Sequence, residues 1–169
     1  MPLSTDIVAS YRGPRRVVRR HLSGPAQEGR ALAFLMIACA VLFVAQWPRL
    51  SREATLDPSV PFEGRVAGAL FGIVLVLPLL AYLVALVVHG LARLAGGKGS
   101  AYGSRVALFW GLLAASPLAL FDGLVAGFIG DGPQRALSGA LFLGAFFYIW
   151  GAGLIEAHRP PTDKSRAPE

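Results

Sequence analysis

The sequence predicts an all-α protein, a polytopic transmembrane bundle of four helical spans preceded by a short amphipathic interfacial helix. Three observations lead to this fold class. The 169 residues are 54% hydrophobic and only 15% charged, whereas a soluble domain carries about 25% charged residues. The charge is segregated, since four long stretches contain almost none of it. Each stretch is also close to or above the roughly 20 apolar residues that a transmembrane helix needs.

Residues 1–25 form a basic amphipathic segment, which we expect on the cytoplasmic side. On a helix from Pro14 to Leu22, Val17 and Val18 share one side with Leu22, and the proline suits the first turn. A helix of this kind lies in the membrane interface. Its basic side is therefore expected to contact anionic lipid headgroups, although orientation of the chain alone would also explain these charges. The arginines on that side are Arg15, Arg16, Arg19 and Arg20.

The first two predicted spans are residues 27–48 and 65–94. The stretch Ala31–Trp47 has no charge, and Pro48 is expected to end the first span. The second span is longer than a perpendicular helix requires, so we expect it to tilt or to extend past the membrane. Pro78 lies within it and is expected to kink the helix without ending it.

The third and fourth predicted spans are residues 105–130 and 135–157, which complete a transmembrane domain over 26–158. Pro117 divides the third span into halves too short to cross a hydrocarbon core about 30 Å thick. We therefore expect one continuous helix that bends near this proline. Residues 159–169 form a polar cytoplasmic tail.

The distribution of basic residues predicts the orientation. With four crossings, twelve of the sixteen Lys and Arg residues lie on the side that holds both termini. Cytoplasmic loops carry an excess of Lys and Arg. We therefore expect both termini in the cytoplasm. The net charge of +6 needs no nucleic acid partner.

Asp122 and His89 are the candidate functional polar residues. A carboxylate in a transmembrane helix is costly and is usually paired, hydrated or neutral. Asp122 has three interpretations, which are proton or cation handling, a polar contact between helices, and a position near the outer interface. His89 lies in the last turns of the second span, where we expect it at the cytoplasmic interface.

The sequence contains no recognisable catalytic motif, and we expect no enzyme activity. GxSxG, HExxH and Walker-type patterns are absent, and catalysis needs several convergent polar groups. The single cysteine, Cys39, has no partner in the chain for a disulfide or a thiolate metal site. We expect neither a cofactor nor a metal.

Small residues four positions apart favour close packing of helices in lipid. Gly64, Gly68 and Gly72 have this spacing at the start of the second span, and Gly123 and Gly127 have it in the third. The pattern fits either a compact bundle or a face for self-association, which would make the protein a homo-oligomer or part of a larger membrane complex.

Several short motifs together resemble the Yip (Ypt/Rab-interacting) family of multispan membrane proteins, in its bacterial form. The resemblance covers residues 10–156 and implies a membrane fold more than an activity. Its bacterial form also implies that the chain lies in a bacterial inner membrane. Family members generally have five spans, whereas four are predicted here. The motifs are Tyr11-Arg12-Gly13-Pro14, the loop Asp57–Pro61, the glycine-rich Gly96–Ser100, Ala115-Ser116-Pro117, and Trp150 with Gly153-Leu154.

Two functional classes are consistent with these patterns. The first is a non-enzymatic protein that acts as a membrane scaffold, organiser or accessory subunit through contacts with other helices and with lipid. The alternative is a small oligomeric transporter or channel that uses Asp122 in a broken third span, because transporters place binding sites at discontinuous helices.

Overall fold

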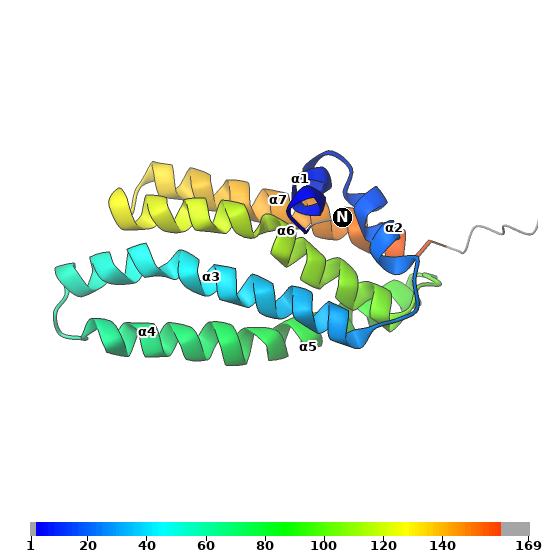
Figure 1. The fold of residues 1–169 in the computed structure, drawn as a ribbon, viewed down its shortest axis with the longest axis horizontal. Coiled ribbons are helices and arrows are strands. Elements are labelled where there is room, and N and C mark those ends of the chain that lie inside the picture. The colour runs from blue at the N-terminus through cyan, green and yellow to red at the C-terminus, as the bar shows by residue number, and fades with distance from the viewer. Residues whose placement is uncertain (1–2, 160–169) are drawn as a thin grey trace, which may run out of the picture.

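The computed structural model describes residues 3–159 and is built from helices (Figure 1). Four helical stretches are long and apolar enough to cross a membrane, so the protein is an integral membrane helical bundle. The predicted fold class is thereby confirmed. The helices are α1 (Leu3–Arg12), α2 (Pro14–Leu22), α3 (Glu28–Leu56), α4 (Phe62–Leu70), the π-helix η1 (Phe71–Val76), α5 (Leu77–Leu94), α6 (Ala101–Phe128) and α7 (Pro133–Ala157).

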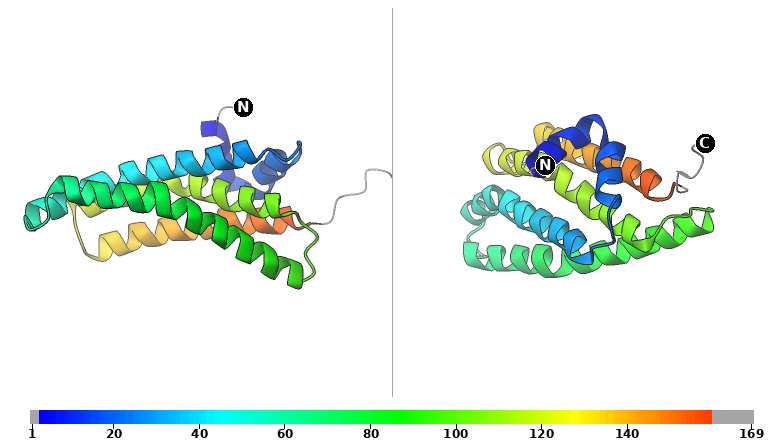
Figure 2. Two further views of the ribbon diagram at one scale, coloured as in Figure 1. Left: turned by 90° about the horizontal axis from the view of Figure 1, so that it is seen from below. Right: turned by 45° about the vertical axis from the view of Figure 1, so that its right-hand side comes forward.

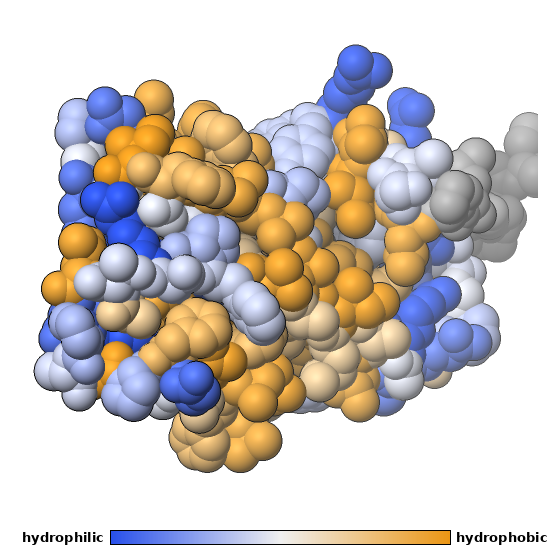
Figure 3. All heavy atoms as spheres, turned by 60° about the vertical axis from the view of Figure 1, so that its left-hand side comes forward, coloured by the Kyte–Doolittle hydropathy of each residue, from blue (hydrophilic) through white to orange (hydrophobic). Residues whose placement is uncertain are grey.

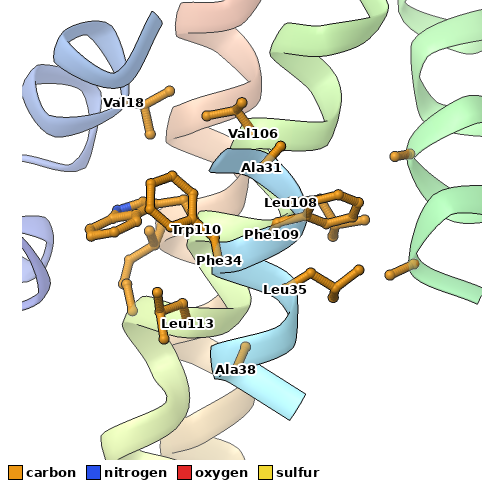
Figure 4. Packing of buried hydrophobic residues seen from close by; sticks show 14 of the residues in the cluster. Val18, Ala31, Phe34, Leu35, Ala38, Val106, Leu108, Phe109, Trp110 and Leu113 are labelled. Atoms are coloured by element: carbon orange, nitrogen blue, oxygen red, sulfur yellow. The ribbon is translucent and has the colours of Figure 1, made fainter. Parts of the chain in front are cut away.

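Helix α6 is the centre of the bundle. In its most apolar stretch 61% of the residues are buried, whereas only 11% are buried in the corresponding stretch of the Phe62–Leu94 span. The difference arises because α3 and α7 pack along α6 (Figure 2). Trp110 and Phe109 of α6 are fully buried and lie with Phe34 and Leu35 of α3 in the main hydrophobic cluster (Figure 4). Burial of such side chains contributes about 1.5–3 kcal/mol each in water-based estimates, whereas in lipid tight packing is the main gain.

Two glycines of α6 let α3 approach very closely. A Cβ atom added to Gly123 would lie 1.8 Å from the carbonyl oxygen of Ala45, and one added to Gly127 would lie 2.3 Å from the Cβ of Pro48. No side chain fits at either position without separating the helices. The structure therefore places Gly123 and Gly127 in the contact between α3 and α6.

Pro48 does not end the first span, contrary to the prediction, because α3 continues for eight further residues to Leu56. Proline cannot donate the backbone hydrogen bond of a helix interior, and α3 contacts α6 at this point. Pro48 lies against Gly127, and the Arg52 guanidinium donates to the Gly127 carbonyl over 3.4 Å. In the third span α6 runs through Pro117 without interruption, and Figure 1 shows this helix changing direction along its length.

The second span lies on the outside of the bundle. No residue of α4 or η1 is buried, and α5 buries only Ala81 and Ala85. The widened π turns directly precede Pro78, and the Leu77 amide donates to the Gly72 carbonyl five residues earlier. A proline ring crowds the preceding turn, and a π segment is one way in which a helix accommodates that strain.

The surface has the hydropathy distribution of a membrane-embedded protein. Figure 3 shows an apolar band across the middle of one face, with hydrophilic residues gathered at both ends. Charged side chains at one end include the Arg49–Glu53 and Arg65–Asp57 pairs. The opposite end, where α3 and α6 begin and α7 ends, also holds the N-terminal helices, and we call it the basic end.

The N-terminal helices α1 and α2 form a hairpin that packs on α6 and α7 (Figures 1 and 2). Val17 and Val18 of α2 are 2% and 0% exposed, and the Val18 side chain lies beside Gly153 of α7. The apolar side of α2 therefore packs against protein, whereas the sequence predicted that it would rest in lipid. The basic side of α2 remains on the surface.

Candidate functional site at the basic end

The basic end is held together by ion pairs between segments distant in sequence. Arg19 of α2 lies 2.6 Å from Glu156, which follows the long apolar stretch of α7 one residue before the helix ends at Ala157. Arg105 at the start of α6 pairs with Glu28 at the start of α3. Exposed ion pairs contribute at most about 1 kcal/mol each. Their position nevertheless shows that α2 lies at the level where the apolar spans end.

Buried hydrogen bonds attach α1 to the middle of α6. The Trp110 indole donates to Ser10 Oγ over 2.9 Å, and Ser10 Oγ donates to the Asp6 carbonyl over 2.7 Å. The Tyr11 hydroxyl donates to the Ala114 carbonyl over 2.9 Å, and burial raises the pKa of Tyr11, which keeps this donor protonated. The Tyr11-Arg12-Gly13-Pro14 motif is therefore the corner of a docked hairpin.

His21 is enclosed where the hairpin meets the bundle. Its ring centroid lies 4.4 Å from that of Trp110 and 5.1 Å from that of Phe34. Burial lowers the pKa of His21, and the Asp6 carboxylate, 3.7 Å from Nε2, offsets only part of this effect. A neutral imidazole is therefore favoured in the docked hairpin.

The four arginines predicted to contact lipid fall into two pairs. Arg19 and Arg20 form ion pairs within the protein, with Glu156 and with Asp6 at 2.6 Å. Arg15 and Arg16 are exposed, and neither forms an ion pair within residues 3–159. Sequence analysis missed Arg12, which together with Arg16 lines an open groove between α1 and α2. Helical spacing could not have identified it, because the corner at Gly13 separates Arg12 from the helix that carries Arg16.

His89 belongs to a polar cluster that sequence analysis did not predict. Its Nδ1 lies 3.4 Å from Ser104 Oγ, which is equally far from Nε2 of His158. The cluster joins α5, α6 and the end of α7. A Cβ atom on Gly99 would lie 2.2 Å from the Ala157 carbonyl oxygen, so the glycine-rich loop packs directly on this end of α7. Within the described part of the chain, no three His, Cys, Asp or Glu side chains are placed to bind a metal.

Asp122 lies in a contact between α6 and α7. Its carboxylate accepts a hydrogen bond of 2.6 Å from the hydroxyl of Ser138, which is 2% exposed. This arrangement corresponds to the polar interhelical contact, one of the three interpretations of Asp122. The structure does not bring Asp122 and His89 together. Asp122 bonds to Ser138 near the start of α7, whereas His89 contacts Ser104 near the start of α6, far from Asp122 along that helix.

Gly64, Gly68 and Gly72 take no part in packing within the bundle, which corrects one of the two interpretations of their spacing. A Cβ atom on Gly68 or Gly72 would meet nothing within 4 Å, and one on Gly64 would meet only the Val60 side chain. The compact-bundle interpretation holds for Gly123 and Gly127 alone. The three glycines of the second span lie on an open surface.

Comparison with known proteins gives one match. The family model described as Yip1 domain matches residues 9–168, which extends the resemblance noted in the sequence at both ends. The match includes the docked hairpin from Ala9 onward as well as all four spans. No curated protein and no solved structure matches the chain.

Proposed function

This chain belongs to the Yip1 domain family, and from that premise we propose that it is a non-enzymatic scaffold, organiser or accessory subunit of the membrane. It acts through contacts of its helices with other membrane proteins or further copies of itself. Both termini lie in the cytoplasm in this proposal, because the basic end carries most of the Lys and Arg residues. The membrane is a bacterial cytoplasmic one, because the motifs resemble the bacterial form of the family.

The observation that carries this proposal is the open second span. Its first half, α4 and η1, contains no buried residue, yet it carries Gly64, Gly68 and Gly72 on one side. Small residues at this spacing allow two helix backbones to approach closely in lipid. Inside the bundle, Gly123 and Gly127 of α6 have the same spacing, and α3 packs closely against them. The chain therefore already contains one helix contact formed by glycines four residues apart.

Disulfide cross-linking tests the proposal. In a Cys39→Ala background, Gly68→Cys is expected to form a covalent homodimer, or an adduct with a partner protein, on mild oxidation in native membranes. Leu141→Cys is the control, because Leu141 is 50% exposed on α7 and is outside the proposed face. Equal cross-linking of both variants, or none at Gly68→Cys, would contradict the proposal.

The alternative is a small oligomeric transporter or channel that uses Asp122. Its support is the presence of a carboxylate in a span with an internal proline. Ion flux into liposomes containing the protein is the test, with Asp122→Asn as the variant. Flux that depends on Asp122 would favour transport over the contact role, whereas the hydrogen bond to Ser138 supports a contact between helices.

A further inference from the structure

The hairpin of α1 and α2 encloses a groove of about 620 Å³ on the surface of the basic end. Thr5, Ala9 and Arg12 line it from α1, and Arg16 and Arg20 line it from α2. Its floor includes Val17, which is 2% exposed and is packed into the bundle on its other side. The groove therefore combines apolar surface, part of it fixed in the bundle, with charged side chains from both helices.

The groove is strongly cationic. Arg16 and Arg20 are four residues apart, which places them on one side of α2, and Arg12 lines the same groove from α1, across the corner at Gly13. The one carboxylate in the groove, Asp6, pairs with Arg20 at 2.6 Å. Arg12 and Arg16 are exposed and form no ion pair within the described residues, so two guanidinium groups remain for an external anion.

The walls of the groove are preorganised. Ser10 and Tyr11 attach α1 to Trp110 and Ala114 of α6 by hydrogen bonds, and Arg19 attaches α2 to Glu156. A ligand therefore would not have to order the hairpin, which reduces the entropic cost of binding. The two free guanidinium groups can each donate paired hydrogen bonds to the oxygens of a phosphate.

The level of the groove identifies the source of the phosphate. The Arg19–Glu156 pair places α2 where the apolar part of α7 ends, which is where lipid headgroups lie. Val8 and Leu3 of α1 are 64% and 41% exposed, and Val8 lines the same groove. An apolar edge beside a cationic groove fits a lipid, whose phosphate and acyl chains are joined, better than a free anion.

We propose that the groove between α1 and α2 is a binding site for the phosphate of an anionic membrane lipid, held by Arg12 and Arg16. This inference rests on the proposed contact function and deepens it by naming a lipid partner and its site. It also separates two roles among the basic residues of the hairpin. Arg19 and Arg20 hold the hairpin in place, while Arg12 and Arg16 bind the ligand.

Binding is measured on the full chain in mild detergent by native mass spectrometry, with phosphatidylglycerol as the anionic lipid and phosphatidylcholine as the zwitterionic one. We expect Arg12→Gln/Arg16→Gln to weaken phosphatidylglycerol binding at least tenfold, since each basic group near a lipid surface contributes about fivefold. Arg93→Gln/Lys98→Gln removes the same charge at exposed positions of the basic end that lie outside the groove, so it is expected to bind nearly as tightly as the unchanged chain.

A steric variant keeps the test independent of charge. Ala9→Trp fills the groove at an exposed position and is expected to reduce phosphatidylglycerol binding with all arginines present. Equal weakening in the two charge variants, or no preference for phosphatidylglycerol over phosphatidylcholine, would overturn the proposal. Inorganic phosphate that displaces the lipid at equal concentration would overturn the assignment to a lipid. None of these results changes the Gly68→Cys cross-link, so the two proposals fail separately.

Discussion

Among single residues, Gly123 determines how closely α3 and α6 pack, and a methyl group there has no room. Because an added Cβ would lie 1.8 Å from the Ala45 carbonyl oxygen, Gly123→Ala must separate the helices. We expect a loss of roughly 1–3 kcal/mol, typical of overpacking, and a lower midpoint of thermal unfolding in detergent.

Gly144→Ala is the matched control for that prediction, because a Cβ atom there would meet nothing within 4 Å. Alanine is the better helix former by about 1 kcal/mol, so the midpoint should stay the same or rise. Equal destabilisation by both substitutions would show that the contact between α3 and α6 is looser than the structure indicates.

His21 makes docking of the hairpin depend on pH. Burial lowers its pKa in the docked state, whereas an undocked hairpin returns it to about 6.5. Below that pH the undocked state binds more protons, so its population rises as pH falls. We expect faster amide hydrogen exchange in residues 3–22 at pH 5.5 than at pH 7.5, after correction for intrinsic rates. His21→Gln should abolish this difference, and a difference that persists would assign the effect to another group.

At the scale of elements, helix α1 buries polar residues on the side that packs against the bundle. On α1 the buried residues are Asp6 and Ser10, not the apolar side chains that its helical periodicity favours. They are buried because Trp110 and Arg20 supply polar partners from elsewhere in the chain. Periodicity predicts an apolar face, but it cannot predict a hydrogen-bonding partner a hundred residues away.

Docking of the hairpin is expected to depend on Ser10. Ser10→Ala leaves the buried Trp110 N–H without its acceptor, which costs roughly 1–3 kcal/mol. We expect trypsin at pH 8 to cleave after the arginines between positions 12 and 20 at least several-fold faster in this variant than in the unchanged chain. Adding Trp110→Phe removes the donor as well and should restore part of the protection in a double-mutant cycle. Additive effects of the two substitutions would mean that the hydrogen bond does not hold α1.

For the molecule as a whole, hydropathy and charge were sufficient to predict four apolar helices long enough to span a membrane. Residue propensities failed where contacts between helices determine the structure. Pro48 is a stop signal by propensity, yet α3 passes it at the place where the helix packs against Gly127 of α6. For the candidate site, the sequence predicted the basic residues on α2 but not the groove. The groove forms because the chain turns at Gly13, which places Arg12 of α1 opposite α2. The meeting of His89 with Ser104 and His158 likewise depends on the arrangement of three helices.

The orientation of the whole molecule is testable by thiol labelling. In a Cys39→Ala background, Ser23→Cys reports the basic end and Ser59→Cys the opposite end, and both positions are exposed. Since the basic end is expected in the cytoplasm, a membrane-impermeant maleimide added to intact cells should label position 59 only. Position 23 should react only after the membrane is permeabilised. The reverse pattern would invert the proposed topology.

The lone thiol gives this protein a reporter that needs no substitution. Cys39 is 0% exposed within the main hydrophobic cluster, so a maleimide reaches it only when the helices part. In the unmodified chain, the labelling rate of Cys39 therefore measures how often the helices of the bundle separate transiently. A ligand or partner that stabilises the bundle would lower this labelling rate, even if it binds far from α3.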